Sequence, residues 1–535
     1  MKTQTHTRHR MKHTTTLLAA ALLGLGLHHT AMAGSNNFAS ATDLTTHNWP
    51  PAVSLAAFTS ESGEPGHRPN GSNGAQKSAW WKWTAPHNGF CTVDTMGHSD
   101  DQFIYDTLIA VYTGTDVNAL TRVAGNDDHD SHLGYGSANS SSVTFYATEG
   151  ATYHFAVDGR SAAAINASNH KAQLRLRLLR ARAEHRVGVI SIPLEEFMHG
   201  MIQFSKTAGH TFSGKILING KSHPFKGVFG LDGYCSISIE RIVPRGAAPQ
   251  PPLTILLDGT QSIANGSPFT EFALISHLIN GAWWGSMATR QTFAKGTESG
   301  LKGRYSAAIS APDNVWKSGV MSFTATGAGV VKGASVLPDG TKTTFGSFLC
   351  ENDASSSWVP VYNGLYKNAG YFASRLKLTE AGATDQVTSV NVFGQHHRPE
   401  APGSLFMPDG RTFFTSVVVK GSTYTPPAAK ARALGFLDGS MGAGKLSIPM
   451  SSGEINPAIM ENLTLDTGNK IIFASKARKP ALTLNKSTGL VTGYLLDDAG
   501  KKRSLTGVLF MDGMTPKLEG HVSGATKNSF FEVIP

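Results

Sequence analysis

The chain has 535 residues, of which 47 are Lys or Arg and 38 are Asp or Glu, giving a formal net charge of +9. Only 16% of residues are charged, 40% are hydrophobic and 57 are glycine. This balance excludes a disordered chain and favours many short strands joined by glycine turns over long charged helices. Three cysteines are too few for a disulfide framework, and we expect each to be a buried small hydrophobe.

Residues 1–33 have the pattern of a secretory signal peptide. Lys2, Arg8, Arg10 and Lys12 form a basic start, an apolar run covers 17–27, and Ala31-Met32-Ala33 is a small-x-small cleavage signal. The apolar run is too short for a membrane anchor. We therefore predict an exported protein, located outside the cell, at the cell surface or in the periplasm, with no membrane span in the mature chain.

Cleavage would remove 4 of the 47 basic residues and lower the net charge to +5. The clearest remaining cluster contains Arg175, Arg177, Arg180, Arg182 and Arg186. Arg175 and Arg177 alternate with leucines, which predicts a strand with one wet face. A nucleic-acid partner is not expected from so dispersed a charge.

Residues 34–182 are predicted to form a β-sandwich, because short alternating runs such as 142–146 and 152–157 are separated by Gly, Asn, Asp and Ser clusters. Residues 79–83 read Ala-Trp-Trp-Lys-Trp, so Trp81 and Trp83 share one strand face and Trp80 occupies the other. We expect the pair in the core, and Trp80 to be a candidate exposed, ligand-binding ring.

Six segments of this region, in this order, resemble the bacterial pre-peptidase C-terminal domain family. They are 37–42 (NFASAT), 63–67 (GEPGH), 78–86 (SAWWKWTAP), 105–114 (YDTLIAVYTG), 126–128 (NDD) and 153–159 (YHFAVDG). The resemblance implies a small jelly-roll-like sandwich appended to secreted bacterial proteins, an accessory module without catalytic residues. Some members of the family bind calcium or extracellular polymers.

The acidic loop after residue 125 is a candidate calcium site. Asn126, Asp128 and Asp130 occupy every second position of the loop, and Asp127 lies between the first two. Their side-chain oxygens suit calcium, which prefers six to eight oxygen ligands. The candidates to complete the shell are Asp106, Asp158 and Glu64. The loop does not match an EF-hand, because Ser131 and Ser137 stand at its sixth and twelfth positions. The alternative is an Asx turn without metal.

Residues 186–535 are predicted to form a larger antiparallel β-barrel or sandwich built of repeated hairpins. Three similar phrases, 209–225, 329–345 and 489–505, each centre on a turn glycine at 220, 340 or 500. The region contains one or two subdomains, with a boundary near residue 400 in the second case. Segments 303–306, 337–342, 359–366, 421–427 and 505–510 resemble an uncharacterised β-rich region of large secreted proteins of environmental bacteria, which implies no activity.

Three other sequence features are weaker indications of function. Residues 439–445 match most of a phosphate-binding loop, but Leu446 replaces the magnesium-binding hydroxyl, so no nucleotide cofactor is expected. His396 and His397 are interpreted as loop surface. Trp283 and Trp284 occupy opposite strand faces, which makes Trp284 a second candidate ligand-binding ring.

These patterns favour an exported, non-catalytic binding or structural protein whose sandwich attaches it to an extracellular polysaccharide, a protein or a cell-surface polymer. The alternative is a secreted glycan or peptide hydrolase, with a site assembled from distant acids of the C-terminal region such as Asp339, Glu351 and Glu380.

Overall fold

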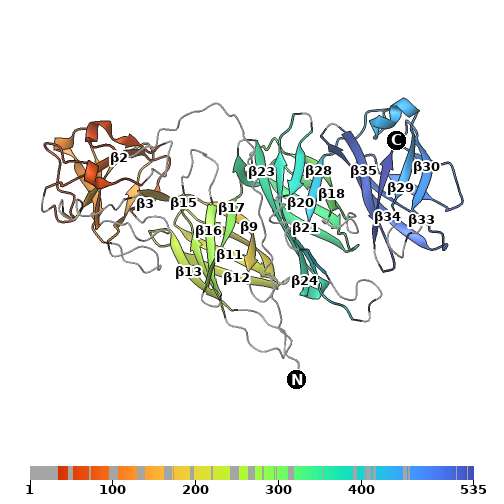
Figure 1. Cartoon of the computed structure of the whole chain (residues 1–535), viewed down its shortest axis with the longest axis horizontal. Coiled ribbons are helices and arrows are strands. Elements are labelled where there is room, and N and C mark those ends of the chain that lie inside the picture. The colour runs from red at the N-terminus through yellow and green to blue at the C-terminus, as the bar shows by residue number, and fades with distance from the viewer. Residues whose placement is uncertain are drawn as a thin grey trace, which may run out of the picture.

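The protein is all-β in the computed structural model, and its sheets form four units in a row (Figure 1). The helical elements that can be bounded within the described residues are short 3-10 turns: η1 Phe38–Ser40, η2 Leu55–Ala57, η3 Val117–Ala119, η4 Tyr366–Asn368 and η5 Gly435–Ser440. The structure describes residues 34–45, 52–71, 74–95, 106–128, 139–161, 165, 172, 174–192, 198–218, 221–240, 252–262, 272–279, 282–293, 296, 298–310, 319–353, 355–382, 384–389, 395–402, 404, 411–413, 417–449, 455, 458–513, 515–526 and 528–535. Within these ranges no helix is long and apolar enough to cross a membrane.

The first unit is the sandwich. Its strands are β1 Thr42–Asp43, β2 Ala79–Thr84, β3 Gly89–Asp94, β4 Thr107–Thr113, β5 Thr121–Asn126, β6 Ser142–Ala147, β7 Thr152–Gly159 and β8 Arg175–Arg180. One sheet has the order β1-β2-β7-β4-β5, and the other β15-β8-β3-β6, so a strand from the second unit completes it. Trp81 and Trp83 lie in the core between the sheets, which confirms that expectation.

The second unit, called the first barrel, is an eight-stranded sheet. Its eight strands are β9 Glu184–Ile192, β10 Met198–Lys206, β11 Thr211–Ile218, β12 Lys221–Val228, β13 Tyr234–Ile239, β14 Leu253–Asp258, β16 Phe272–Ile279 and β17 Ala282–Arg290; the short strand β15 Gln261–Ser262 lies between β14 and β16 in the chain but pairs with the sandwich. The sheet runs β12-β11-β10-β9-β17-β16-β14-β13, and its end strands β12 and β13 touch, so it is nearly closed. Buried apolar side chains, among them Ile202, Phe204 and Phe212, fill the interior.

The third unit, called the central sheet, has eleven strands. They are β18 Gly303–Ser310, β19 Gly319–Ala325, β20 Val330–Val336, β21 Lys342–Phe348, β22 Cys350–Asp353, β23 Ser356–Leu365, β24 Gly370–Thr379, β25 Gln386–Ser389, β26 Gln395–Arg398, β27 Arg411–Phe413 and β28 Val418–Thr423. The sheet curls around its own core, which includes Tyr305, Phe323 and Phe372.

The fourth unit, called the last barrel, has strands β29 Ala443–Ile448, β30 Ile459–Leu465, β31 Ile471–Phe473, β32 Ala481–Leu484, β33 Leu490–Leu496, β34 Lys502–Asp512, β35 Thr515–Val522 and β36 Ser529–Ile534. Its end strands β31 and β32 also touch. Apart from β15, the described strands from β9 onward form three sheets, and position 400 lies between β26 and β27 of the central sheet. Consecutive sheets are separated by two gaps in the chain, one between Arg290 and Gly303 and one between Thr423 and Ala443.

Two of the predicted hairpin turns are seen directly. Gly340 links β20 to β21 with φ +85°, and Gly500 links β33 to β34 with φ +73°, values that glycine adopts without strain. The turn at Gly220 lies outside the described residues. Cys91 and Cys350 are buried as expected, whereas Cys235 is half-buried.

The arginine-rich strand is part of a charged seam between the sandwich and the first barrel, so the wet-face prediction is wrong. Arg175 and Arg177 both bind Asp94, at 2.6 and 3.5 Å, and Asp94 is fully buried. The guanidinium of Arg177 also lies 4.7 Å from the centre of the Tyr234 ring in the barrel. The sequence could not show this, because the partners are far away along the chain.

A second set of buried charges continues the seam. Glu184 binds Arg186 at 2.8 Å, and the ammonium of Lys206 donates to the carbonyls of Arg180 and Arg182 at 2.7 and 2.8 Å. Burial alone would raise the pKa of Glu184, but Arg186 and Lys206 outweigh it and lower the pKa to about 2.

We predict that Asp94→Asn destabilises the protein by about 3–5 kcal/mol, because it leaves two arginines without their buried counter-charge. Urea unfolding of the full chain in calcium-free buffer measures the change. Asp106→Asn is the matched control: Asp106 pairs with Arg160 at 3.2 Å, but the two side chains are 26% and 61% exposed. Its loss should cost far less than the loss of Asp94, because solvent screens an exposed pair, and equal costs for the two variants would contradict the importance of the buried pair.

Acidification should weaken the same seam. Because the folded pKa of Glu184 lies below its ordinary value of 4.5, its stabilisation is complete above that pH and is lost as the pH falls toward about 2. Melting temperatures across this window should therefore fall more steeply for the natural protein than for Glu184→Gln. Parallel pH profiles would show that Glu184 does not contribute.

Candidate functional site

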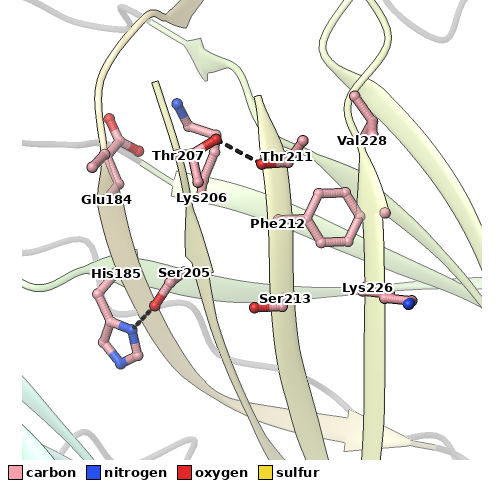
Figure 2. Close-up of a pocket in the computed structure, with 12 residues that line it drawn as sticks. Glu184, His185, Ser205, Lys206, Thr207, Thr211, Phe212, Ser213, Lys226 and Val228 are labelled. Atoms are coloured by element: carbon pink, nitrogen blue, oxygen red, sulfur yellow. Dashed lines mark hydrogen bonds between the residues drawn. The ribbon is translucent and has the colours of Figure 1, made fainter. Parts of the chain in front are cut away.

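A groove runs across the outer face of the first barrel, over strands β9 to β12. Side chains alternate between the two faces of each strand, so every second residue points outward while Phe204, Phe212 and Phe225 fill the interior. The cross-strand register places His185 opposite Ser205, Ser205 opposite Ser213, and Ser213 opposite Lys226. Figure 2 shows these four side chains along one line.

The groove has two adjoining parts of about 890 Å³ each, which share His185, Ser205, Ser213 and Lys226. One part extends toward Thr207, Thr211 and Val228. The other extends past Gln203, Lys215, Ser222 and Pro224 to Phe348 of the central sheet. Hydroxyl, amide and ammonium groups, interspersed with apolar side chains such as Val228 and Pro224, thus line a surface that crosses four strands.

The charge of this groove is positive. Lys215 and Lys226 lie on the same face, and neither ammonium has an ion-pair partner among the described residues. The Glu184 carboxylate is at the groove edge, but it is buried and bound by Arg186 and Arg182. The lysines are therefore available for an anionic ligand.

His185 contributes a neutral polar group. Its Nδ1 is 2.9 Å from the Ser205 hydroxyl, and its ring packs against Phe348 with centroids 5.0 Å apart. Burial lowers the pKa of His185, so the imidazole is uncharged near neutral pH. The exposed Ser205 hydroxyl can offer a hydrogen bond to a ligand without adding charge, whereas His185 Nε2 is buried.

An apolar seam fixes one end of the groove. Val187, Val189 and Met201 of the first barrel pack against Tyr362 and Tyr371 of the central sheet, with Phe348 at the border. Arg290 and Glu351 form an ion pair across the same junction. The groove is therefore the open continuation of a closed interface between two units.

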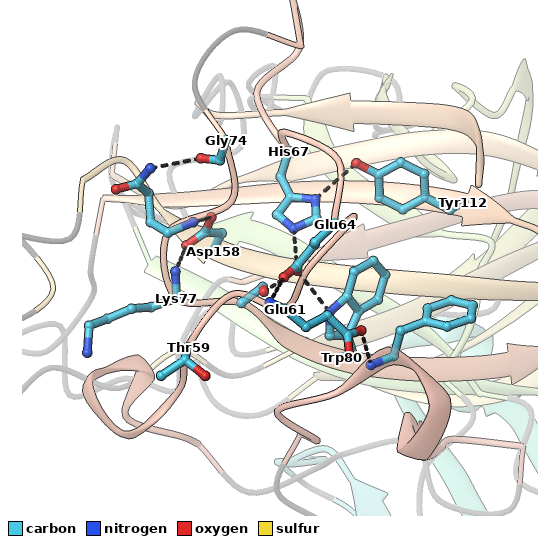
Figure 3. A network of polar contacts seen from close by, with 12 residues as sticks. Thr59, Glu61, Glu64, His67, Gly74, Lys77, Trp80, Tyr112 and Asp158 are labelled. Atoms are coloured by element: carbon cyan, nitrogen blue, oxygen red, sulfur yellow. Dashed lines mark hydrogen bonds and ion pairs between the residues drawn. The ribbon is translucent and has the colours of Figure 1, made fainter. Parts of the chain in front are cut away.

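The predicted calcium ligands are placed in separate environments. Glu64 is buried and accepts from Trp80 Nε1 at 2.9 Å, from Ser78 Oγ and from the Glu61 amide, and His67 Nε2 is 3.0 Å away (Figure 3). His67 in turn contacts the Tyr112 hydroxyl at 2.9 Å. This network holds the segment after η2 on the sheet, so Glu64 has no open ligand position.

Asp158 is likewise used by the fold. Its two carboxylate oxygens accept from the backbone amides of Gln76 and Lys77 at 2.7 and 2.8 Å. Asp106 pairs with Arg160, and Asn126 Oδ1 accepts from the amides of Asp127 and Asp128, which is an Asx turn. Asp130 lies outside the described residues.

The described residues contain no group of three or more His, Cys, Asp or Glu side chains able to hold a metal ion. Because Asp130 and most of its loop are not among them, calcium binding stays a prediction.

The calcium prediction has a direct test. If calcium binds here, a free calcium concentration about a hundred times the dissociation constant should stabilise the folded chain by about 2.7 kcal/mol. Removing it with a chelator should then lower the melting temperature, and Asp128→Asn should abolish that response. The full chain is needed because β15 belongs to the second unit. An unchanged melting temperature would leave only the Asx turn.

Trp80 is not the exposed ring that we expected as a ligand-binding residue. The Trp80 side chain is fully buried, its ring packs edge-on against Phe38 with centroids 5.3 Å apart, and its indole N–H is used by Glu64. Residues of the N-terminal segment cover the strand face that we expected to be open. Trp284 lies in β17 opposite His277, but its side chain is outside what the structure describes.

The interpretation of His396 as loop surface is also wrong. His396 belongs to β26, is 1% exposed, and its Nε2 lies 2.8 Å from the Tyr366 hydroxyl. Tyr366 also donates to Asp339, which binds Arg398 at 2.7 Å. Asp339 and Glu351, two of the acids considered for a hydrolase, are thus each paired with an arginine.

The groove residues escaped the sequence-based prediction, although their alternation is visible. Residues 211–217 read Thr-Phe-Ser-Gly-Lys-Ile-Leu, which marks an amphipathic strand. That pattern does not say which strands are neighbours, so it could not bring His185, Ser205 and Lys226 into one line.

No family model matches the chain, and no curated protein matches it. The resemblance to the pre-peptidase C-terminal domain family stays a prediction.

Proposed function

We propose that this protein is an exported, non-catalytic binding protein that attaches to an anionic extracellular polysaccharide through the groove on β9–β12. One observation carries the proposal: two lysines without ion-pair partners among the described residues share an open, hydroxyl-lined groove with Ser205, Ser213 and His185. Lysines attract carboxylate or sulfate groups, and hydroxyls exchange hydrogen bonds with sugar hydroxyls.

The shape of the site supports a long ligand over a small molecule. The groove lies on the outside of a barrel whose interior is filled, so its two parts are open surfaces and not an enclosed cavity. A polymer can follow such a surface across several strands. The side chains that line it favour a polysaccharide over single-stranded nucleic acid, which typically needs exposed aromatic rings for stacking.

The sandwich has an accessory role in this proposal. Its resemblance to the pre-peptidase C-terminal domain family and the predicted signal peptide both suggest a secreted protein that acts at a surface. Lys206 of the first barrel donates to the Arg180 carbonyl of the sandwich, and Arg177 lies over the Tyr234 ring, so the sandwich is held against the unit that carries the groove.

We predict that Lys215→Ala and Lys226→Ala together weaken binding to soluble polygalacturonate by about tenfold or more, equivalent to about 1.4 kcal/mol, because both charges that contact the anionic chain are lost. Titration calorimetry of the mature chain in low salt measures this. Lys445→Ala is the matched control, since Lys445 is an exposed strand lysine on the last barrel.

Three results would overturn the proposal: no binding of polygalacturonate, equal binding of a neutral glucan, or tighter binding of DNA of equal length. Added salt should weaken the interaction if the two lysines carry it.

A further inference from the structure

A second groove lies at the next junction along the chain, between the central sheet and the last barrel. It measures about 610 Å³ and has an apolar floor that includes Val320, Val336 and Leu490. Its walls present hydroxyl groups and one ammonium: Ser322, Lys342, Thr344, Thr492 and Thr506. No carboxylate is among the described residues that line it.

Strand β21 connects the two grooves. Lys342 at its beginning lines the second groove, and Phe348 at its end lines the groove on β9–β12. Strand alternation puts Lys342, Thr344, Gly346 and Phe348 on one face, which we call the β21 row, while Phe345 and Ser347 are buried on the other. At about 3.3 Å per residue the row is about 20 Å long.

The middle of the β21 row is open and positively charged. Gly346 pairs with Lys332 of β20, which points to the same face and is exposed. A Cβ atom on Gly346 would meet nothing closer than the Val331 carbonyl, at 4.0 Å. Neither Lys332 nor Lys342 has an ion-pair partner within the described part of the chain.

We infer that a single anionic polysaccharide chain runs along the β21 row and occupies both grooves, so that Lys332 and Lys342 are binding residues in addition to Lys215 and Lys226. The inference rests on the proposed function, and it adds a second site and a path between the two. A chain that reaches both sites binds the second at a high effective concentration, which can raise affinity by a factor of about 100 or more.

The test introduces a charge at the midpoint of the β21 row of the full mature chain. Gly346→Glu places a carboxylate beside Lys332, and Gly346→Gln is a neutral control of matched size. The open space at Gly346 and its ordinary backbone angle allow both variants to fold, which melting curves verify. The probes are long polygalacturonate and a short oligogalacturonate that fills only one groove.

We expect the natural protein to bind the long chain at least tenfold more tightly than the short one. Gly346→Glu should remove most of that advantage and leave short-chain binding within about twofold, whereas Gly346→Gln keeps most of the advantage. Lys342→Ala should also reduce the long-chain advantage without affecting the groove on β9–β12.

Equal affinity for long and short chains, or identical behaviour of Gly346→Glu and Gly346→Gln, would overturn the inference. If short-chain binding still depended on Lys215 and Lys226, the proposed function would stand alone. If the natural protein bound neither probe, both would fall.

Discussion

Buried charge at the seam between the sandwich and the first barrel is the constraint on which the arrangement of this protein depends. Asp94, Glu184, Arg186 and Lys206 are each at most 7% exposed, so each requires a partner: Asp94 pairs within the sandwich and Glu184 with Arg186 within β9, whereas Lys206 donates across the seam to the Arg180 carbonyl. Removing one partner of a buried pair leaves a charge without solvent or counter-ion, which typically costs 3–5 kcal/mol. Separating the two units would also remove β15 from the sandwich sheet.

Barrel closure explains why the later units join through their outer faces. The first and last barrels leave few unpaired strand edges, because β12 contacts β13 and β31 contacts β32. Their interiors are filled by apolar residues, so contact with a neighbour can use only outward side chains. Two small apolar patches do this, one around Val189 and Tyr362 and the other around Val508 and Phe510.

The same geometry creates the grooves. Two convex sheets can touch only over a limited patch, and beside that patch the surfaces diverge. Phe348 and Val320 stand at these borders, each beside hydroxyl and lysine side chains that continue outward. A candidate binding surface thus follows from packing closed sheets in series, with its polarity set by the outward residues.

Local sequence signals predicted the parts of this structure that depend on neighbours in the chain. The β class, the Gly340 turn and the core position of Trp81 follow from alternation and turn chemistry. Trp80, Arg177 and His396 were misread because Glu64, Tyr234 and Tyr366, which contact them, lie 16 to 57 residues away. The number of sheets and the candidate groove depend on strand order, which no local pattern encodes.

The buried cluster around Asp339 shows how one end of the β21 row is held. Asp339 accepts from the Thr341 amide at 2.9 Å and from Arg398 at 2.7 Å, directly before β21 begins. Tyr366, which donates to Asp339, itself has a φ of +52°, a left-handed value that costs a bulky residue of order 1 kcal/mol. Asn528 of the last barrel donates to the Pro338 carbonyl at 3.1 Å. These contacts hold the β20–β21 hairpin against the rest of the central sheet and against the last barrel. Buried polar groups therefore set the backbone position of Lys342.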